Sequence, residues 1–492
     1  MRYVLAIDEG TTGTTSLMVD AAGQVAGRGY REIPQYYPQP GWVEHDPAEI
    51  VAAVLDSARD AMAASGAVPD AIGITNQRET VVVWERATGR PVHRAIVWQD
   101  RRTAPRCAAV AAEYRERIAA LTGLVVDAYF SASKIEWLIR ELRLLDRYRP
   151  GELAAGTIDS WLIWQLTGGR VHATDPTNAS RTMLYDIDRL AWSDELCALF
   201  GVPKDMLPEV RPSSGAFGVA REDFFGAEIP ILGVAGDQQA ALFGQGCWER
   251  GEGKNTYGTG AFLLLNSGSE RPRESAGLLT TIGCDARGRP AYALEASIFI
   301  AGAAVQWLRD GLAIIETASD SERLARSLAS NDEVYFVPAL TGLGAPYWEP
   351  DARGTIVGLT RGTGRAHLAR AALEAMAFGT ADVLRRMSEC SGTTFHHVRV
   401  DGGASANNWL MQFQADILGV PVERPDVVET TALGAAGLAG LARGVWTSAS
   451  DFLARRTFDV FTPAMPRPEA DRVLAGWHRA VRTASHWARD TA

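Results

Sequence analysis

The stretch Tyr3-Val-Leu-Ala-Ile-Asp8-Glu9-Gly10-Thr11-Thr12-Gly13-Thr14-Thr15-Ser16-Leu-Met-Val19 opens the chain and decides its fold. An apolar run leads into a turn rich in glycine and threonine, and a second apolar run follows. This order predicts a β-hairpin. Backbone N–H groups and hydroxyls in such a turn can approach phosphate oxygens closely, and Asp8 could hold a hydrated Mg²⁺. A plain hairpin turn with hydroxyl-rich strands is the alternative.

A similar arrangement occurs in the second half of the chain. Asn255-Thr-Tyr-Gly-Thr-Gly-Ala-Phe262 is another turn of small and hydroxyl-bearing residues, and the apolar run Leu263-Leu-Leu265 follows it. We interpret the pair as an internal repeat with one phosphate-binding hairpin in each of two domains. Glycines cluster at 244–253, so we expect the domains to span 1–246 and 247–492.

Apolar periodicity predicts the other elements. The segment 71–84 has the same strand–turn–strand pattern as the opening hairpin. Because strands and helices alternate along the chain, we expect an α/β fold. Helices are expected at about 48–64, 133–145, 299–314, 366–389, 406–418, 430–443 and 468–489.

Composition excludes several classes of protein. The 492 residues are 47% hydrophobic and 22% charged, which is ordinary for a globular chain of about two domains. The net charge of −10, without any Lys/Arg block, argues against a nucleic-acid partner. Five scattered cysteines without a C-x-x-C pair argue against a disulfide framework or a zinc site, and fit a cytoplasmic location. The most apolar stretch, 432–442, is too short to span a membrane and predicts a buried helix.

A carboxylate near mid-chain is a candidate general base. In Gly233-Val-Ala-Gly236-Asp237-Gln238-Gln239 an apolar strand end, a glycine and an acid describe a carboxylate projecting from a rigid element. Asp237 could take the proton of a hydroxyl that attacks phosphorus. Alternatively, Asp237 could be the N-cap of a helix over 238–243.

Two further motifs carry polar chemistry. Asn76-Gln-Arg78-Glu79 offers donors and acceptors to vicinal hydroxyls, or is an exposed ion pair of little energetic consequence. Val400-Asp-Gly-Gly-Ala-Ser-Ala-Asn-Asn408 has a glycine pair before a helix, which suits nucleotide binding or a tight strand-to-helix turn. These motifs, with the hairpins and Asp237, are spread over both halves, as in a cleft between two domains.

With these motifs in place, the chain resembles the FGGY carbohydrate kinase family of the actin-like ATPase superfamily, from about Ala6 to Trp477. The resemblance implies two ribonuclease-H-like domains with an interdomain cleft that holds ATP and Mg²⁺. The motifs are similar to those of family members that phosphorylate glycerol to sn-glycerol 3-phosphate, and which often form dimers or tetramers. The most specific segments are 40–46, 73–80, 95–103, 175–183, 236–245 and 341–348, with Tyr129-Phe-Ser-Ala-Ser-Lys134.

The resemblance also implies roles for individual residues. It implies that Asp237 is the base and that Asp8 and Asp237 hold the metal. The implied polyol contacts are Arg78, Glu79, Trp98, Tyr129, Asp237, Gln238 and Phe262. The implied ATP contacts are Thr11, Thr12, Gly13, Thr15, Thr259, Gly302, Gln306, Gly403 and Asn407.

Two positions depart from the family pattern. Glu9 stands where the family usually has Gln, and Thr15 stands where it usually has a basic residue. Together they add a negative charge and remove a positive charge beside the phosphates. At a partly dry site each charge is worth about 1 kcal/mol or more, so we expect weaker ATP binding or slower turnover.

Two alternatives remain open from the sequence. One is a family member that phosphorylates another small polyol or sugar, such as erythritol or a ketopentose. The other is a weakened paralogue that binds a polyol and a nucleotide, or an actin-like assembly module, and the departures at Glu9 and Thr15 are its support.

Overall fold

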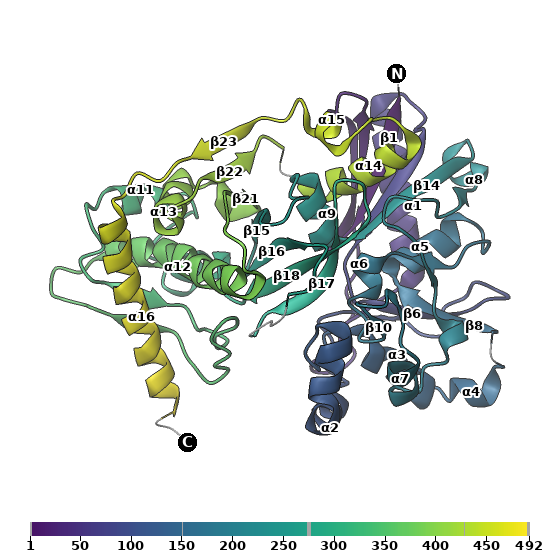
Figure 1. The fold of residues 1–492 in the computed structure, drawn as a ribbon, viewed down its shortest axis with the longest axis horizontal. Coiled ribbons are helices and arrows are strands. Elements are labelled where there is room, and N and C mark those ends of the chain that lie inside the picture. The colour runs from purple at the N-terminus through teal and green to yellow at the C-terminus, as the bar shows by residue number, and fades with distance from the viewer. Residues whose placement is uncertain (1, 150, 273–276, 428, 490–492) are drawn as a thin grey trace.

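The structure is a computed structural model that describes residues 2–149, 151–272, 277–427 and 429–489 (Figure 1). The first half of the chain forms one lobe, drawn in purple to teal, and the second half forms most of the other. Two helices of the second half, α14 (Thr430–Arg443) and α15 (Ala449–Leu453), lie against the first lobe.

The first lobe is built on a six-stranded sheet in the order β13-β14-β5-β1-β2-β3. Strands β1, β2 and β3 are antiparallel, whereas β5 is parallel to β1 and β14 is parallel to β5. The expected opening hairpin is confirmed, and Gly10 N–H donates to Gly13 O across its turn at 3.0 Å. The strands are β1 (Tyr3–Glu9), β2 (Gly13–Asp20), β3 (Val25–Glu32), β5 (Ala71–Asn76), β13 (Val219–Ala220) and β14 (Ile229–Gly236).

The second lobe repeats this topology in a seven-stranded sheet in the order β17-β18-β16-β15-β21-β22-β23. Strands β15, β16 and β18 are antiparallel, while β21 is parallel to β15 and β22 is parallel to β21. The predicted internal repeat is therefore confirmed. The strands are β15 (Gly253–Tyr257), β16 (Ala261–Gly268), β17 (Leu279–Cys284), β18 (Pro290–Ile298), β21 (Val398–Asp401), β22 (Val422–Pro425) and β23 (Phe458–Phe461).

The hairpin predicted within 71–84 is wrong. After β5 the chain turns through Glu79, whose φ is 62°, and the next strand joins a different sheet. That four-stranded sheet has the order β4-β7-β6-β8. Its strands are β4 (Glu44–His45), β6 (Val81–Glu85), β7 (Ala95–Ile96) and β8 (Leu153–Thr157).

Five of the expected helices are confirmed with small shifts at their ends. Helix α1, for example, begins after Asp46, which accepts a hydrogen bond from Ala48 N–H, and ends at Gly66 with a φ of 64°. The five are α1 (Pro47–Ser65), α12 (Arg365–Ser391), α13 (Asn408–Leu418), α14 and α16 (Arg467–Arg489).

Two expected helices are shorter than predicted. The helix expected at 133–145 is α3 (Ser131–Glu141), because Arg143 has a φ of 48°, and α4 (Leu144–Arg147) follows as a separate turn. The helix expected at 299–314 begins only at Gly302 as α10 (Gly302–Gln306), and one π-helical turn carries it to Gly311. The remaining helices include α2 (Ala104–Thr122), α5 (Ile158–Leu166), α6 (Pro176–Ala179), α7 (Asp194–Leu199), α8 (Glu222–Phe225) and α11 (Asp320–Arg326).

Helices α9 (Asp237–Gly244) and α14 follow equivalent strands of the repeat and cross at glycines. A Cβ on Gly434 would lie 1.8 Å from the carbonyl oxygen of Ala240, so this crossing requires glycine. Helix α14 packs its apolar residues on β1, β2 and β5, which confirms the buried helix predicted at 432–442. Over the described ranges, we find no helix that is both long and apolar enough to cross a membrane.

Candidate active site

The carboxylates of Asp8 and Asp237 lie at one edge of the six-stranded sheet. Strands β1, β5 and β14 are parallel, so their carboxyl ends meet at this edge, with Asp8 near the end of β1 and Asp237 directly after β14. Burial, together with repulsion from Asp237, raises the pKa of Asp8 from 3.8 to about 7. The two carboxylates are thus close enough to repel each other.

Asp237 is the first residue of α9, and Gly236 is the N-cap, so the N-cap interpretation of Asp237 is wrong. The side chain of Asp237 is 32% exposed. Its Oδ1 atom forms an ion pair with Arg78 Nε at 3.0 Å and accepts a hydrogen bond from the Gln238 backbone N–H at 2.7 Å. One carboxylate oxygen is therefore held in place while the group stays accessible.

Arg78 and Glu79 are buried, so the exposed-ion-pair interpretation of this motif is also wrong. The Nη1 and Nη2 atoms of Arg78 donate to the two carboxylate oxygens of Glu295 at 2.5 and 3.1 Å. Arg78 Nη1 also donates to Gln239 Oε1 at 3.2 Å. These contacts fix the guanidinium plane beside Asp237.

Glu79 has a left-handed backbone conformation, which is costly for a residue with a long side chain. The Ser131 hydroxyl donates to its carbonyl oxygen at 3.1 Å, and Arg181 Nε donates to its Oε1 at 2.6 Å. Burial raises the pKa of Glu79, and Arg181 and Arg78 oppose this effect. Strain concentrated on a buried, ion-paired glutamate is typical of a functional site.

Aromatic rings border the same region. The rings of Trp98 and Tyr129 meet edge to face with centroids 5.5 Å apart, and Trp98 Nε1 donates to Thr11 Oγ1 at 2.9 Å. Phe262 and Leu264 are two positions apart on β16, so their side chains leave the same face of the sheet. Leu264 pairs with Lys254 on one neighbouring strand and with Glu295 on the other, so Phe262 lies on the same face as Lys254 and Glu295. Lys254 in turn donates to Gln238 Oε1.

A separate cavity of about 540 Å³ lies in the second lobe. All five residues of that lobe expected to contact ATP line it: Thr259, Gly302, Gln306, Gly403 and Asn407. The first glycine of the pair has a steric reason, since a Cβ on Gly402 (φ 83°) would lie 2.3 Å from the carbonyl oxygen of Tyr257. The volume of the cavity suits a small-molecule site. The sequence did not single out Tyr257, Val305, Arg309, Ala318, Ser319, Ser321, Glu322, Leu373, Ala404 and Ala406, which also line it.

The expected phosphate contacts of the first lobe, Thr11, Thr12 and Gly13, lie in or beside the β1–β2 turn, and Thr15 lies on β2. Glu9 is fully buried, and its Oε1 accepts from Gln77 Nε2 at 3.1 Å. Burial raises the pKa of Glu9 well above 4.5, although Gln77 opposes this. Burial therefore works against the negative charge expected at Glu9, because it favours the neutral acid.

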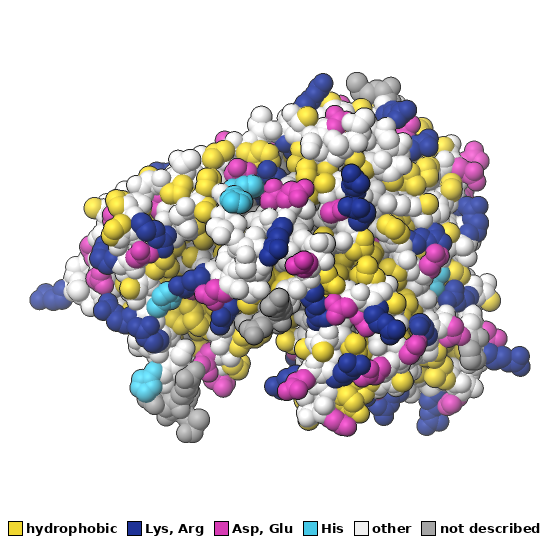
Figure 2. Space-filling view, viewed as in Figure 1, with side chains coloured by type: hydrophobic (Ala, Val, Ile, Leu, Met, Phe, Trp, Pro, Cys, Tyr) yellow, Lys and Arg dark blue, Asp and Glu magenta, His cyan; other side chains and the backbone are white. Residues whose placement is uncertain are grey.

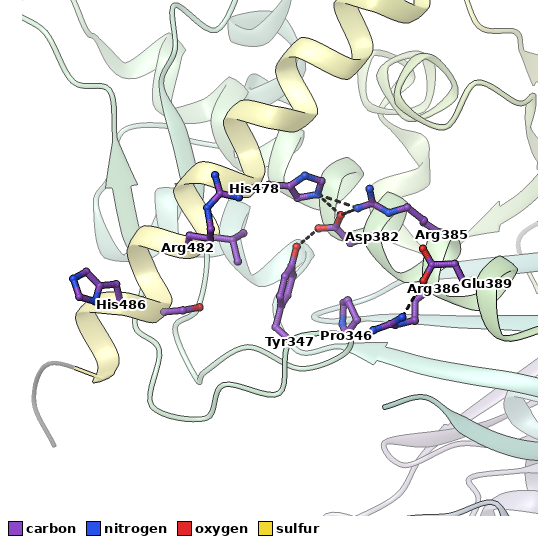
Figure 3. A pocket seen from close by; sticks show the side chains of 11 residues that line it. Pro346, Tyr347, Asp382, Arg385, Arg386, Glu389, His478, Arg482 and His486 are labelled. Atoms are coloured by element: carbon purple, nitrogen blue, oxygen red, sulfur yellow. Dashed lines mark hydrogen bonds and ion pairs between the residues drawn. The ribbon is translucent and has the colours of Figure 1, made fainter. Parts of the chain in front are cut away.

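The surface carries charges of both signs, with basic and acidic side chains interspersed over the face in Figure 2. A cavity of about 710 Å³ lies between α12, α16 and Tyr347, away from the residues above (Figure 3). There the buried Asp382 accepts hydrogen bonds from Tyr347, Arg385 and His478 at 2.5, 2.6 and 2.7 Å. None of the residues expected in the site lines this cavity.

Sequence reasoning missed four residues of the polar network around Asp237. These are Arg181, Gln239, Lys254 and Glu295. Arg181 lies within 175–183, a segment specific to the family. The segment marked this part of the chain as important but did not indicate what Arg181 does. Glu295 lies in an apolar strand, where only its charge between Leu294 and Ala296 marks it.

Comparisons with known proteins place the chain in a family. The N-terminal domain of the FGGY family of carbohydrate kinases matches residues 3–244, and the C-terminal domain of that family matches 253–443. The chain belongs to the FGGY family of carbohydrate kinases.

Individual relatives match this chain over nearly their whole length. A protein named glycerol kinase from Symbiobacterium thermophilum is 55% identical over 494 residues, covering 99% of each chain. Another of that name from Halorhodospira halophila is 54% identical and covers 100% of this chain and 98% of its own. The crystal structure of Plasmodium falciparum glycerol kinase with ADP is 37% identical, with a TM-score of 0.94 and 98% of each chain covered.

A ligand-bound xylulose kinase from Lactobacillus acidophilus has the same fold, at 22% identity and a TM-score of 0.87, with 100% of this chain and 98% of that one covered.

Proposed function

We propose that this chain transfers the γ-phosphoryl group of ATP to glycerol and forms sn-glycerol 3-phosphate. The observation that carries the proposal is the partly exposed carboxylate of Asp237, held by Arg78 at the edge of the sheet where Asp8 also lies. The full-length relatives named glycerol kinase support the choice of substrate.

Asp237 is the proposed general base. Arg78 Nε and the Gln238 backbone N–H engage its Oδ1 atom, so we assign Oδ2 as the atom that accepts the proton of the terminal hydroxyl. Phosphoryl transfer needs little covalent chemistry from a protein, so positioning and electrostatic stabilisation supply most of the acceleration.

The polyol-binding residues combine polar groups with an aromatic wall. Arg78, Glu79 and Gln238 offer donors and acceptors to hydroxyls, and Trp98, Tyr129 and Phe262 offer apolar faces to C–H groups. Glycerol carries both kinds of surface. A buried site that hydrogen-bonds hydroxyls also discriminates against ligands that leave its polar groups unpaired.

The carboxylates of Asp8 and Asp237 fit a magnesium ion. Burial and the repulsion between them raise the pKa of Asp8, and a divalent cation held by both would relieve the repulsion. Among the described residues, no group of three or more His, Cys, Asp or Glu side chains could hold a metal ion. Mg²⁺, however, keeps several waters and needs only one or two carboxylates. When bound with ATP, the ion would neutralise charge on the phosphate oxygens.

ATP is proposed to bind in the cavity of the second lobe, with its phosphates directed to the two glycine turns. Thr259 and Gly403 would contact it there, while Thr11, Thr12, Gly13 and Thr15 would face the γ-phosphate from the first lobe. The ADP in the Plasmodium falciparum structure supports a nucleotide site in this fold.

The domain assignment belongs to the same proposal. Residues 1–246 would supply the base and most of the polyol site, and residues 247–492 would supply the nucleotide site. A cytoplasmic location and a homodimer or homotetramer remain predictions from the sequence.

A coupled assay of ADP release tests the proposal. The purified chain with ATP and Mg²⁺ is given glycerol, erythritol or xylulose in turn. We expect release that depends on glycerol and a much lower kcat/KM with the other two. A preference for erythritol or xylulose would contradict the substrate, and binding of ATP and glycerol without ADP release would establish the weakened paralogue instead.

A further inference from the structure

A buried network of ion pairs joins the two sheets beside Asp237. Arg78 and Arg181 belong to the first lobe, whereas Glu295 lies on β18 of the second. Glu295 lies 2.5 Å from Arg78 Nη1 and 3.0 Å from Arg181 Nη2, and all three side chains are at most 3% exposed. A carboxylate from the second half of the chain thus holds two arginines from the first half.

Glu295 adds a buried carboxylate that both arginines share. The guanidinium groups of Arg78 and Arg181 repel each other, and burial removes the screening by water. Burial alone would raise the pKa of Glu295, but Arg181 and Arg78 lower it to about 2. Glu295 is therefore a carboxylate throughout the neutral range, and removing its charge would leave two buried cations poorly compensated.

Each arginine also contacts, through its Nε atom, a residue proposed to act on the polyol. Arg78 Nε reaches Asp237 Oδ1 at 3.0 Å, and Arg181 Nε reaches Glu79 Oε1 at 2.6 Å. A guanidinium group is a rigid planar fork, so the hydrogen bonds from the two Nη atoms of Arg78 to Glu295 also fix the direction of its Nε–H bond. Arg181 is held to Glu295 by an ion pair. Glu295 therefore orients Arg78 beside Asp237, and its charge holds Arg181 beside Glu79.

We propose that Glu295 is a positioning residue of the polyol site, which is complete only when β18 is docked against Arg78 and Arg181. This inference rests on the function proposed above. Glu295 sets the donor and acceptor geometry that glycerol meets, and it is not among the residues that line the cavity assigned to the nucleotide.

The test is the variant Glu295→Gln, which keeps the shape of the side chain and removes its charge. We expect KM for glycerol to rise roughly tenfold or more, while KM for ATP stays within about twofold of the wild-type value. A KM for glycerol within about twofold of wild type would overturn the proposal, and so would an equal rise in both KM values.

Asp382→Asn is the matched control (Figure 3). Asp382 is also a buried carboxylate of the second half that accepts from several donors, but it lies apart from the polyol site. We expect this variant to lower Tm and to leave KM for glycerol unchanged. If Asp382→Asn raised KM for glycerol as much as Glu295→Gln, general destabilisation would explain both results and the proposal would fail.

Glu295→Asp keeps the inference testable if the first variant does not fold. It retains the charge and shortens the side chain. If Glu295→Gln folds, we expect KM for glycerol to rise less in Glu295→Asp than in Glu295→Gln. If Glu295→Gln does not fold, we expect Glu295→Asp to fold and to show a several-fold rise in KM for glycerol. A wild-type KM for Glu295→Asp alongside an unfolded Glu295→Gln would overturn the inference. Absence of glycerol-dependent ADP release by the wild type would contradict the proposed function instead.

Discussion

Thr15 lies directly across from Asp8 in the β1–β2 ladder, so both side chains leave the same face of the sheet. Asp8 in turn lies close enough to Asp237 for the two carboxylates to repel each other beside the proposed phosphate site.

An arginine at position 15 would therefore lie beside the two carboxylates and the transferred phosphate. We expect Thr15→Arg to lower KM for ATP or to raise kcat, by several-fold, because a charge at a partly dry site is worth about 1 kcal/mol or more. Steady-state kinetics with varied ATP would check this. If neither constant changed, Thr15 would have no bearing on ATP use.

The crossing of α9 and α14 predicts a steric effect. In Gly434→Ala the new Cβ would meet the backbone of Ala240 at 1.8 Å, and backbone atoms cannot move aside as a flexible side chain can. We expect a loss of about 3 kcal/mol in the free energy of unfolding, measured by urea denaturation.

Gly364→Ala is the control for this crossing. Gly364 has a φ of −128°, and a Cβ there would have no heavy atom within 4 Å. We expect a change of about 1 kcal/mol or less. Equal losses in the two variants would show that close approach is not the reason for the glycine at 434.

His172 predicts a dependence of stability on pH. Its Nδ1 accepts from Arg86 at 3.0 Å and its Nε2 donates to the carbonyl oxygen of Ala155 at 3.2 Å. Burial, with Arg86 nearby, lowers the pKa of His172 from 6.5 to about 3. Between pH 6.5 and 3 the unfolded chain therefore binds a proton at His172 and the folded chain does not. The contribution of His172 to the free energy of unfolding falls as the pH drops below 6.5.

The variant His172→Asn should remove this contribution. Between pH 6.5 and 5 we expect the wild type to lose up to about 2 kcal/mol more than the variant, at about 1.4 kcal/mol per pH unit. Urea midpoints at pH 8, 6.5 and 5 would show it. Parallel curves for the two proteins over this range would contradict the prediction.

The local parts of the fold followed from the sequence. The glycine and threonine turns at Gly10 and Gly258 predicted hairpins because the signal lies within a few residues, and the repeat of that signal predicted the doubled sheet. The segment 71–84 failed because the same local pattern does not say whether two strands pair with each other. The left-handed turn at Glu79 sends β6 to another sheet instead.

Site residues could be predicted from the sequence where they lie within a short local motif. Arg78, Glu79 and Asp237 stood out by their neighbours, and the structure brings Arg78 and Asp237 into contact. Glu295 did not stand out, because its partner Arg78 is 217 positions away and an ion pair across two sheets leaves no periodic trace in either strand.

The kcat of Asp237→Asn tests the proposed chemistry most directly. The substitution keeps the size of the side chain but removes its ability to accept the hydroxyl proton, so we expect kcat to fall by roughly 10²–10⁴-fold while the protein still binds ATP. A variant that kept much of the wild-type kcat would contradict the role of Asp237 as the base.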